Sequence, residues 1–373
     1  MFKHQMSRRQ ALLGLSTLGA GSLRALRAKS TLTVGVLTEA TTGSHLSSYL
    51  KGLARCQGVA RVVLSDPSGK TFEEAAQLLK GRLVTTYRDH QELLRREQPR
   101  LAVVTLEGHH APPVISDTLQ SGCHVLTEKP SCVRLEDFES LARLADSHGV
   151  HLMLSMATRV SLAVRKARAL VEAGFIGKPY SATMDWIADQ TRLTRPEYQK
   201  SWLSFKRKAG GGKLLFHGIH YLDALQYLIG DQIVRVSAIC ENVGGQPIEV
   251  EDAAVVSFRC QKGLVGTLNA GYYLDRGYQN QIRVWGSKGW FHLDLPSGEP
   301  LKWYSTHSES PHGIQSFTYQ DDPNLYKVLV QESVDAALGL APAPLTTQDS
   351  LHVMKVIFAA YRSAESDTTQ RIG

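Results

Sequence analysis

The stretch "TVGVLTEATTGSHLSSYL", residues 33–50, decides the fold of the N-terminal half of the chain. The apolar run at 32–37 is typical of a buried parallel strand, and apolar residues then recur at helical spacing from Leu46 to Leu53. A strand, a tight turn and a helix in this order predict the opening unit of a dinucleotide-binding sheet.

The same alternation of apolar strands and helical stretches continues to about residue 157. It predicts an α/β domain, a doubly wound parallel Rossmann sheet, over 31–157. From about 180 the pattern changes to long alternating strands without helices between most of them. We therefore expect a C-terminal domain over 158–373 with an open, mostly antiparallel sheet covered by helices on one face. Gly286 and Gly289 mark a hairpin turn, and helices are expected at about 323–339 and 347–363.

The first thirty residues form a basic leader. They contain no acid, and they supply most of the formal net charge of +7, so the charge does not indicate nucleic-acid binding. Arg8 and Arg9 precede a short apolar run, which resembles a twin-arginine export signal. We expect a periplasmic or otherwise exported protein, with a cytoplasmic one as the alternative. Elsewhere no apolar run reaches the length of a membrane-spanning helix, so the mature chain is not expected to insert stably into a membrane.

The five cysteines show no metal-binding or C-x-x-C spacing. We interpret them as mostly buried thiols. A disulfide between Cys240 and Cys260, on neighbouring predicted strands, is the alternative.

The turn after the first strand departs from the phosphate-binding pattern G-x-G-x-x-G. Thr38 and Ala40 occupy the first two glycine positions, and only Gly43 remains. A β-branched residue at the first position adds bulk and disfavours positive φ, so the backbone must contact a pyrophosphate more loosely or take another path. The N-terminus of the following helix still attracts phosphate, and Thr41 and Thr42 add hydroxyl donors.

Two further strand ends carry candidate residues. Asp66 ends the second strand, where a carboxylate binds ribose hydroxyls and repels a 2′-phosphate, which favours NAD over NADP. A turn that merely stops the strand is the alternative for Asp66. Glu128, Lys129 and Pro130 follow a later buried strand, where a desolvated lysine could act as an acid or base toward a substrate oxygen. A solvated surface lysine is the alternative there.

From about residue 31 onward the chain resembles the glucose-fructose oxidoreductase, inositol dehydrogenase and rhizopine-catabolism (Gfo/Idh/MocA) family. The resemblance rests on five segments in order: "EKP" at 128–130, "MATR" ending at Arg159, "LVEAGFIGKP" at 170–179, "GGGKLLFHGIHYLDALQYLIG" at 210–230, and "LTTQDSLHVMKVIFAAYRSAES" at 345–366. It implies an NAD(P)-dependent enzyme that holds a sugar, cyclitol or similar polyol between its two domains. It also implies a homo-oligomer formed through the open sheet.

The resemblance assigns roles to individual residues. Lys129 would lie beside the reacting carbon, and His220 occupies the position of the family's histidine, whereas Phe216 replaces its usual aspartate. His217 is the candidate to compensate, since His217 and His220 would share a helix face. The remaining cofactor candidates are His109, Glu128 and Lys129. His109 lies in "LEGHH", where the family usually has Thr-Pro-Asn. Substrate candidates are Arg159, Arg192, Tyr198, Trp202, His220 and Asp223; a structural role is the alternative for each. No metal site is expected.

Three functions remain open at this stage. The first is oxidation of a carbohydrate or polyol hydroxyl with tightly bound NAD, NADP being the less favoured cofactor. The second is NAD-dependent glycoside cleavage through transient oxidation and elimination. The third is a catalytically silent ligand-binding protein, which the altered glycine turn and Phe216 both favour.

Overall fold

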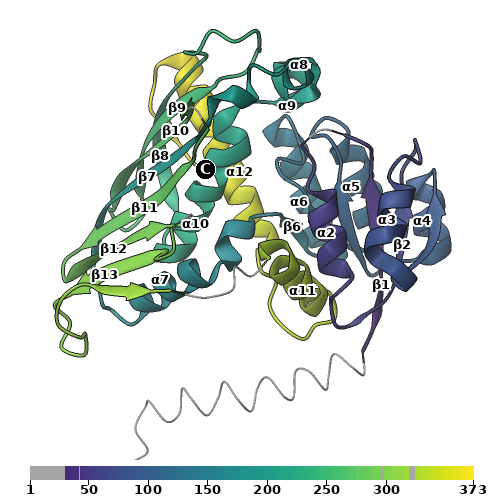
Figure 1. Ribbon diagram of the computed structural model, residues 1–373, viewed down its shortest axis with the longest axis horizontal. Coiled ribbons are helices and arrows are strands. Elements are labelled where there is room, and N and C mark those ends of the chain that lie inside the picture. The colour runs from purple at the N-terminus through teal and green to yellow at the C-terminus, as the bar shows by residue number, and fades with distance from the viewer. Residues whose placement is uncertain (1–29, 42, 275, 296, 319–323) are drawn as a thin grey trace, which may run out of the picture.

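A computed structural model describes residues 30–41, 43–274, 276–295, 297–318 and 324–373. These residues form two sheet-containing parts that lie side by side (Figure 1). The predicted leader, with Arg8 and Arg9, and the cofactor candidate Thr42 lie outside the described residues.

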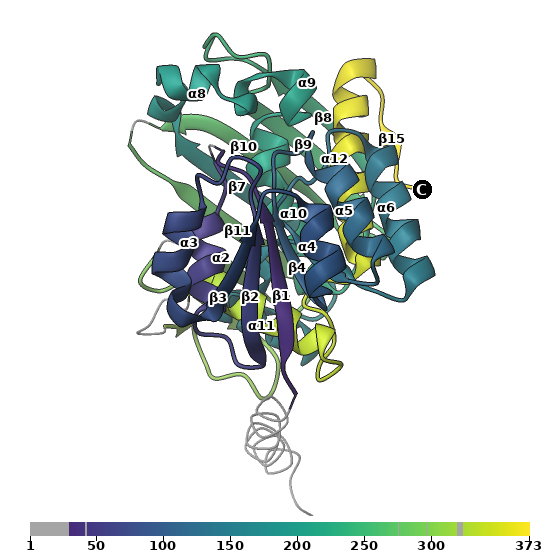
Figure 2. The ribbon, with the colours of Figure 1, turned by 90° about the vertical axis from the view of Figure 1, so that its right-hand side faces the viewer.

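The N-terminal part is a six-stranded parallel sheet in the order β3-β2-β1-β4-β5-β6. Its strands are β1 (Leu32–Thr38), β2 (Val59–Ser65), β3 (Leu83–Tyr87), β4 (Leu101–Thr105), β5 (His124–Thr127) and β6 (Leu152–Leu154). The helices α2 (Leu46–Leu53), α3 (Phe72–Leu79), α4 (His90–Glu97), α5 (Ala111–Gln120) and α6 (Leu135–His148) lie on its two faces (Figure 2). The predicted Rossmann sheet is confirmed. Because the strand order reverses between β1 and β4, a ligand site is expected where these two strands end.

The C-terminal part is a nine-stranded sheet in the order β14-β13-β12-β11-β7-β10-β9-β8-β15. Its strands are β7 (Pro179–Asp189), β8 (Ile233–Glu241), β9 (Ala253–Cys260), β10 (Val265–Leu274), β11 (Gln279–Gly286), β12 (Gly289–Asp294), β13 (Leu301–Ser305), β14 (Gln315–Phe317) and β15 (Gln370–Arg371). Every pairing is antiparallel except that of β7 with β10. Gly286 pairs with Gly289 across the predicted hairpin turn.

One face of this second sheet is covered by α7 (Leu162–Glu172), α10 (Ile219–Ile229) and α12 (Thr347–Ser366), as Figure 1 shows. The opposite face carries exposed apolar side chains, among them Ile239 and Val255, which lie opposite each other in neighbouring strands. The prediction of an open, mostly antiparallel sheet covered on one face is therefore confirmed.

Helix α11 (Leu325–Ala337) crosses back to the first part of the molecule and packs against α2. Leu329, Val330 and Val334 are buried in the same core as β1 and β2. The N-terminal core thus includes a helix from the region predicted as the C-terminal domain. This contact depends on tertiary packing, which no local sequence pattern specifies.

The cysteines and the possibility of membrane spans can now be checked. Cys240 lies opposite Ala254 and Cys260 opposite Ile233 in the β8–β9 ladder, so these two cysteines do not pair, and both are thiols. Among the described residues, no helix combines the length and the apolar character needed to cross a membrane.

Candidate active site

The segment after β5 holds a buried acid next to a buried base. The Glu128 carboxylate accepts a hydrogen bond from the Tyr49 hydroxyl at 2.8 Å and lies 3.2 Å from His45 Nδ1, so it is anchored to the first helix. Lys129 is buried, and its Nζ donates to the Phe216 carbonyl oxygen at 2.9 Å. Burial lowers the pKa of Lys129. Lys129 is therefore not a solvated surface lysine, and it joins the N-terminal sheet to the second part of the molecule.

The glycine-rich segment is held in place by a buried carboxylate. Glu251 accepts hydrogen bonds from the amides of Gly212 and Leu214, at 2.7 and 2.9 Å. A Cβ atom at Gly212 would lie 2.0 Å from the Glu251 carbonyl oxygen, so only glycine fits there. The π-helical turn Leu214–Gly218 follows and leads into α10. Such turns often occur at functional sites.

His217 and His220 both lie beside Trp186, a residue of β7. The centroid of each histidine ring lies 5.4 Å from that of the Trp186 ring. Burial lowers the pKa of His220 to about 3 and that of His217 well below its usual range. Both imidazoles are therefore neutral near pH 7, and each keeps one ring nitrogen without a proton.

Tyrosines and an arginine complete this side of the site. Tyr272 of β10 is buried, with its hydroxyl 3.5 Å from His217 Nδ1, whereas Tyr273 points to the other face and is exposed. The hydroxyls of Tyr272 and Tyr198 share a hydrogen bond. Arg192, in the short helix Gln190–Arg192, lies over the Tyr198 ring at 5.3 Å. The structure thus brings Arg192 and Tyr198 to the histidines.

Lys213 belongs to this cluster, although the sequence analysis missed it. Its side chain is fully buried, and its Nζ lies 4.4 Å from the centroid of the Tyr272 ring and 5.9 Å from that of Trp186. Among the described residues Nζ has no hydrogen-bond partner. Burial, with smaller contributions from Arg192 and Lys129, lowers its pKa to about 6. The available signal was its spacing, since Lys213 precedes His217 by four residues on one helical face.

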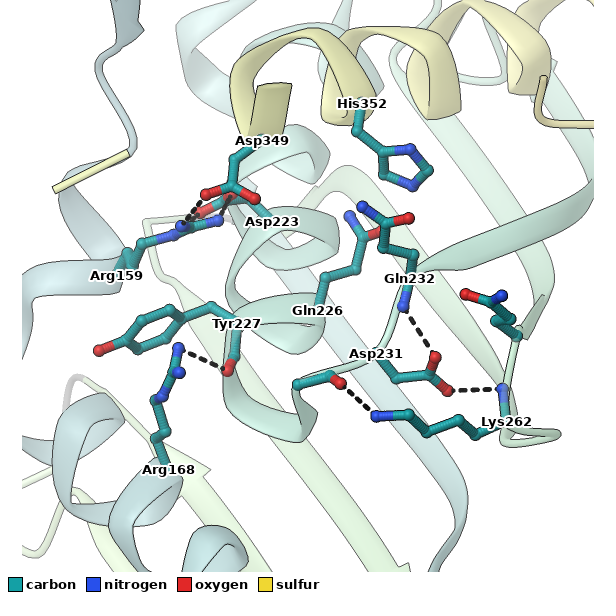
Figure 3. Close-up of a pocket in the computed structure, with 12 residues that line it drawn as sticks. Arg159, Arg168, Asp223, Gln226, Tyr227, Asp231, Gln232, Lys262, Asp349 and His352 are labelled. Atoms are coloured by element: carbon teal, nitrogen blue, oxygen red, sulfur yellow. Dashed lines mark hydrogen bonds and ion pairs between the residues drawn. The ribbon is translucent and has the colours of Figure 1, made fainter. Parts of the chain in front are cut away.

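Three of the predicted substrate residues have structural contacts instead. The Arg159 guanidinium donates to both carboxylate oxygens of Asp223 and, at 3.2 Å, to Asp349. These three side chains point toward one another at the edge of a cavity of about 380 Å³ between α7, α10 and α12 (Figure 3). Trp202 packs edge-on against Phe216, with ring centroids 5.5 Å apart. These contacts favour the structural alternative for Arg159, Asp223 and Trp202.

The turn after β1 is closed by hydrogen bonds to the end of β4. Thr38 is buried, and its hydroxyl accepts from that of Thr105 at 2.7 Å. Ala40 is exposed. Gly43 has φ +84°, so the third glycine position retains a conformation that favours glycine.

A second set of contacts joins this turn to the loop after β4. The Thr41 hydroxyl donates to the Glu107 carboxylate at 2.6 Å, and Glu39 accepts from the Glu107 amide at 2.8 Å. His110 Nδ1 lies 3.0 Å from Glu39, and His109 Nδ1 lies 3.6 Å from Glu107. Glu107, His109 and His110 also place possible metal ligand atoms within 4.8 Å of one another, although the sequence analysis expected no metal. The one carboxylate of this group, Glu107, already accepts a hydrogen bond from Thr41.

The carboxylate of Asp66 binds groups of its own turn. Its carboxylate accepts hydrogen bonds from the amide and hydroxyl of both Ser68 and Thr71, at 2.9–3.0 Å, and the residue is fully buried. Burial raises the pKa of Asp66, but these hydrogen bonds together outweigh burial and lower it. The geometry favours the turn alternative over a ribose contact.

A parallel sheet with a switch point, joined to an open sheet whose neighbouring helical segments carry the imidazole groups, agrees with the architecture of a two-domain, NAD-binding oxidoreductase. Residues 40–156 match the family model described as an oxidoreductase family with an NAD-binding Rossmann fold, and 164–292 match the GFO/IDH/MocA C-terminal domain. The chain therefore belongs to the Gfo/Idh/MocA family of oxidoreductases.

Individual relatives agree with this assignment. A 2,7-anhydro-N-acetylneuraminate hydratase of Mediterraneibacter gnavus is 29% identical over 305 residues, covering 79% of this chain and 75% of the relative. The myo-inositol 2-dehydrogenase of Thermotoga maritima is 28% identical over 210 residues, covering 54% of this chain and 59% of that enzyme. The crystal structure of an oxidoreductase domain protein from Kribbella flavida superimposes with a TM-score of 0.83 at 25% identity, over 92% of this chain and all of that one.

Proposed function

We propose that this protein transfers a hydride between a bound NAD and a carbon bearing a secondary hydroxyl in a sugar, cyclitol or related polyol. The observation that carries the proposal is the convergence of buried Lys129, which follows β5 of the first sheet, with the neutral His217 and His220, which lie in the π-helical turn and in α10 beside the second sheet. NAD, when bound, accepts the hydride. Lys129 then holds the reacting oxygen by a hydrogen bond, while one of the histidines takes the hydroxyl proton.

The chain retains part of a dinucleotide site. The N-terminus of α2, with the positive-φ Gly43 before it, offers backbone amides to a pyrophosphate near residues 41–45. Mass spectrometry of the denatured purified protein tests cofactor identity and tight binding directly. Release of NAD(H) is expected. Release of NADP(H) instead would contradict the cofactor assignment.

Glycoside cleavage is the second candidate, and two observations favour it. One is the relative named a 2,7-anhydro-N-acetylneuraminate hydratase. The other is that His217 and His220 are neutral, so each keeps an unprotonated ring nitrogen for the proton removed in an elimination. Transient oxidation regenerates the cofactor within each turnover, so cleavage produces no net NADH. Accumulation of NADH with a polyol supports the dehydrogenase, whereas product without NADH supports the cleaving enzyme.

A catalytically silent binding protein is the third candidate. The departures Thr38, Ala40 and Phe216 favour it. If the protein from its own host carries no nucleotide and millimolar NAD or NADP gives no thermal shift, this candidate replaces both enzymes.

We also propose export by the twin-arginine route, on the strength of Arg8 and Arg9 and the apolar run after them. This route would carry the folded protein with its cofactor. Replacing both arginines with lysine is expected to keep the protein in the cytoplasm. Unchanged periplasmic or extracellular delivery would contradict export by this route and favour the cytoplasmic alternative.

We propose that the exposed face of the second sheet joins copies of the chain into a homo-oligomer. Its support is the exposed apolar surface at residues such as Ile239, Val255 and Val265. Ultracentrifugation of the protein and of an Ile239→Asp variant tests this. Identical monomeric profiles for both proteins would contradict it.

A further inference from the structure

Three basic side chains gather at the candidate active site. Arg192 and Lys129 both lie close enough to Lys213 to lower its pKa, and all three act in the same way on His217. Lys129 is hydrogen-bonded to the Phe216 carbonyl. Lys213, by contrast, ends between two aromatic rings with its Nζ unsatisfied by any described residue.

Two carboxylates lie near these groups, and Glu128 raises the pKa of its neighbour Lys129. Glu128 is bound by Tyr49 and His45 on the side of α2. Glu251 lies behind the backbone of Lys213, where it is bound by the amides of Gly212 and Leu214 and by the Tyr361 hydroxyl. Neither carboxylate contacts the Lys213 amine, so among the described residues this amine has no carboxylate partner.

A buried amine without a partner destabilises the folded protein unless something binds it. An oxyanion next to Arg192 and Lys213 would offset the charge of Arg192, allow Lys213 to regain its proton, and accept hydrogen bonds from both side chains. Trp186 and Tyr272 enclose the same place with apolar rings, which strengthens such an ion pair by excluding water.

We propose that Arg192 and Lys213 bind an oxyanion carried by the substrate, a carboxylate or a phosphate ester, so that the protein acts on anionic sugar derivatives in preference to neutral polyols. This inference rests on the proposed function, whose substrate class it narrows. Arg192, Lys213, Trp186 and Tyr272 all come from the second part of the molecule, whereas the cofactor turn is built from β1 and β4. The anion is therefore assigned to the substrate and not to the phosphates of NAD.

The experiment compares matched compounds on the NAD-loaded protein by calorimetry. The pairs are glucuronate with glucose, galacturonate with galactose, and glucose 6-phosphate with glucose. At least one acid or phosphate is expected to bind about 10- to 100-fold more tightly than its neutral partner, the usual gain from a charge-assisted contact. Lys213→Met should remove that gain and leave the affinity for the neutral partner and for NADH within about threefold.

Lys200→Met provides the matched control, because Lys200 is an exposed lysine of the nearby helix α8 (Pro196–Lys200). It should leave every affinity unchanged. Circular dichroism checks that each variant is folded. The acid and phosphate arms separate the two kinds of oxyanion, and a loss of NADH affinity in Lys213→Met would reassign the cluster to the cofactor.

A second measurement determines how many protons the protein takes up when the anion binds. With Lys129, Arg192 and His217 facing it, Lys213 is mostly neutral at about pH 7.5, so binding of the anion should take up close to one proton. Calorimetry in buffers of different ionisation enthalpy measures this uptake, which Lys213→Met should abolish. The inference is overturned if no acid or phosphate binds better than its neutral partner, or if Lys213→Met weakens both members of a pair equally. Reduction of NAD by a neutral polyol alone would overturn it while supporting the proposed function.

Discussion

The turn after β1 carries Thr38 and Ala40 in place of the family's glycines, and the cluster around Lys213 carries Phe216 in place of its aspartate. The two regions differ in whether their polar side chains find partners. Thr38 in the first glycine position is bonded to Thr105, and the neighbouring Thr41 and Glu39 are bonded to the loop after β4. Lys213 is buried with its amine unsatisfied, beside two other basic groups. In the turn after β1 the protein satisfies its own polar side chains. The unsatisfied amine of Lys213 lowers the stability of the folded protein, and a bound ligand can remove that penalty.

Lys129 gives the largest expected effect, because it follows a strand of the first sheet and its amine reaches the cluster at Phe216. Lys129→Met should lower kcat by roughly 10² to 10⁴, the usual loss when a positioned acid or base is removed. The measurement is steady-state turnover on whichever compound is found to reduce NAD, with thermal unfolding as the check of fold. Normal turnover would remove Lys129 from the mechanism. His217→Ala and His220→Ala, compared in the same assay, identify which histidine takes the proton.

Lys213→Met should stabilise the protein without ligand. Keeping this amine neutral at about pH 7.5 costs the folded state up to about 4 kcal/mol, at about 1.4 kcal/mol per pH unit below the ordinary lysine pKa. Replacing it with methionine should raise Tm by about 5 °C. Lys200→Met should leave Tm nearly unchanged. A fall in Tm for Lys213→Met would mean that the buried amine is satisfied in solution, which would break the comparison.

The pH dependence of stability has a definite sign. The folded-state pKa of Lys213 is about 6, below its value in the unfolded chain, so between about pH 6 and 10 the unfolded chain binds a proton that the folded one does not. The free energy of unfolding of the wild type should therefore rise with pH across this window. Denaturant titrations of the wild type and of Lys213→Met should show a weaker rise in the variant. Equal slopes would contradict the low pKa.

Sequence patterns predicted most of the fold, because strand and helix periods, the hairpin glycines and the switch in strand type are local signals. The resemblance to the family, and not a local pattern, named Lys129 and His220 as site residues. Sequence patterns did not predict the packing of α11 on α2, or the ion pair between Arg159 and Asp223, residues 64 positions apart. Lys213 was missed because a lysine in sequence is ordinarily exposed. Its burial depends on Trp186 and Tyr272 from strands that pair only in the folded sheet.

A variant of Asp66 tests whether its carboxylate stabilises the turn or binds the cofactor. Asp66→Ala should lower the free energy of unfolding by about 2 kcal/mol, since the amides and hydroxyls of Ser68 and Thr71 lose their acceptor. Because the carboxylate is occupied, NADH affinity should change by less than about threefold. Asp89→Ala is the control, since Asp89 caps α4, a helix that packs on the same sheet. A large loss of NADH affinity with Asp66→Ala alone would restore the ribose contact.

The smallest effect is expected where glycine is restored. Ala40 is exposed, so Ala40→Gly should cost about 0.5 to 1 kcal/mol or less, through the greater freedom of the unfolded chain. Thr38→Gly should cost more, about 1 to 2 kcal/mol, because it also removes the hydroxyl that Thr105 binds. Denaturant titration compares the two costs, and fluorescence titration with NADH should show neither variant altering affinity by more than about threefold. If either variant bound NADH tenfold more tightly, the native side chain at that position would be hindering cofactor binding. The hydrogen-bonded turn would then lower the affinity for NADH instead of leaving it unchanged.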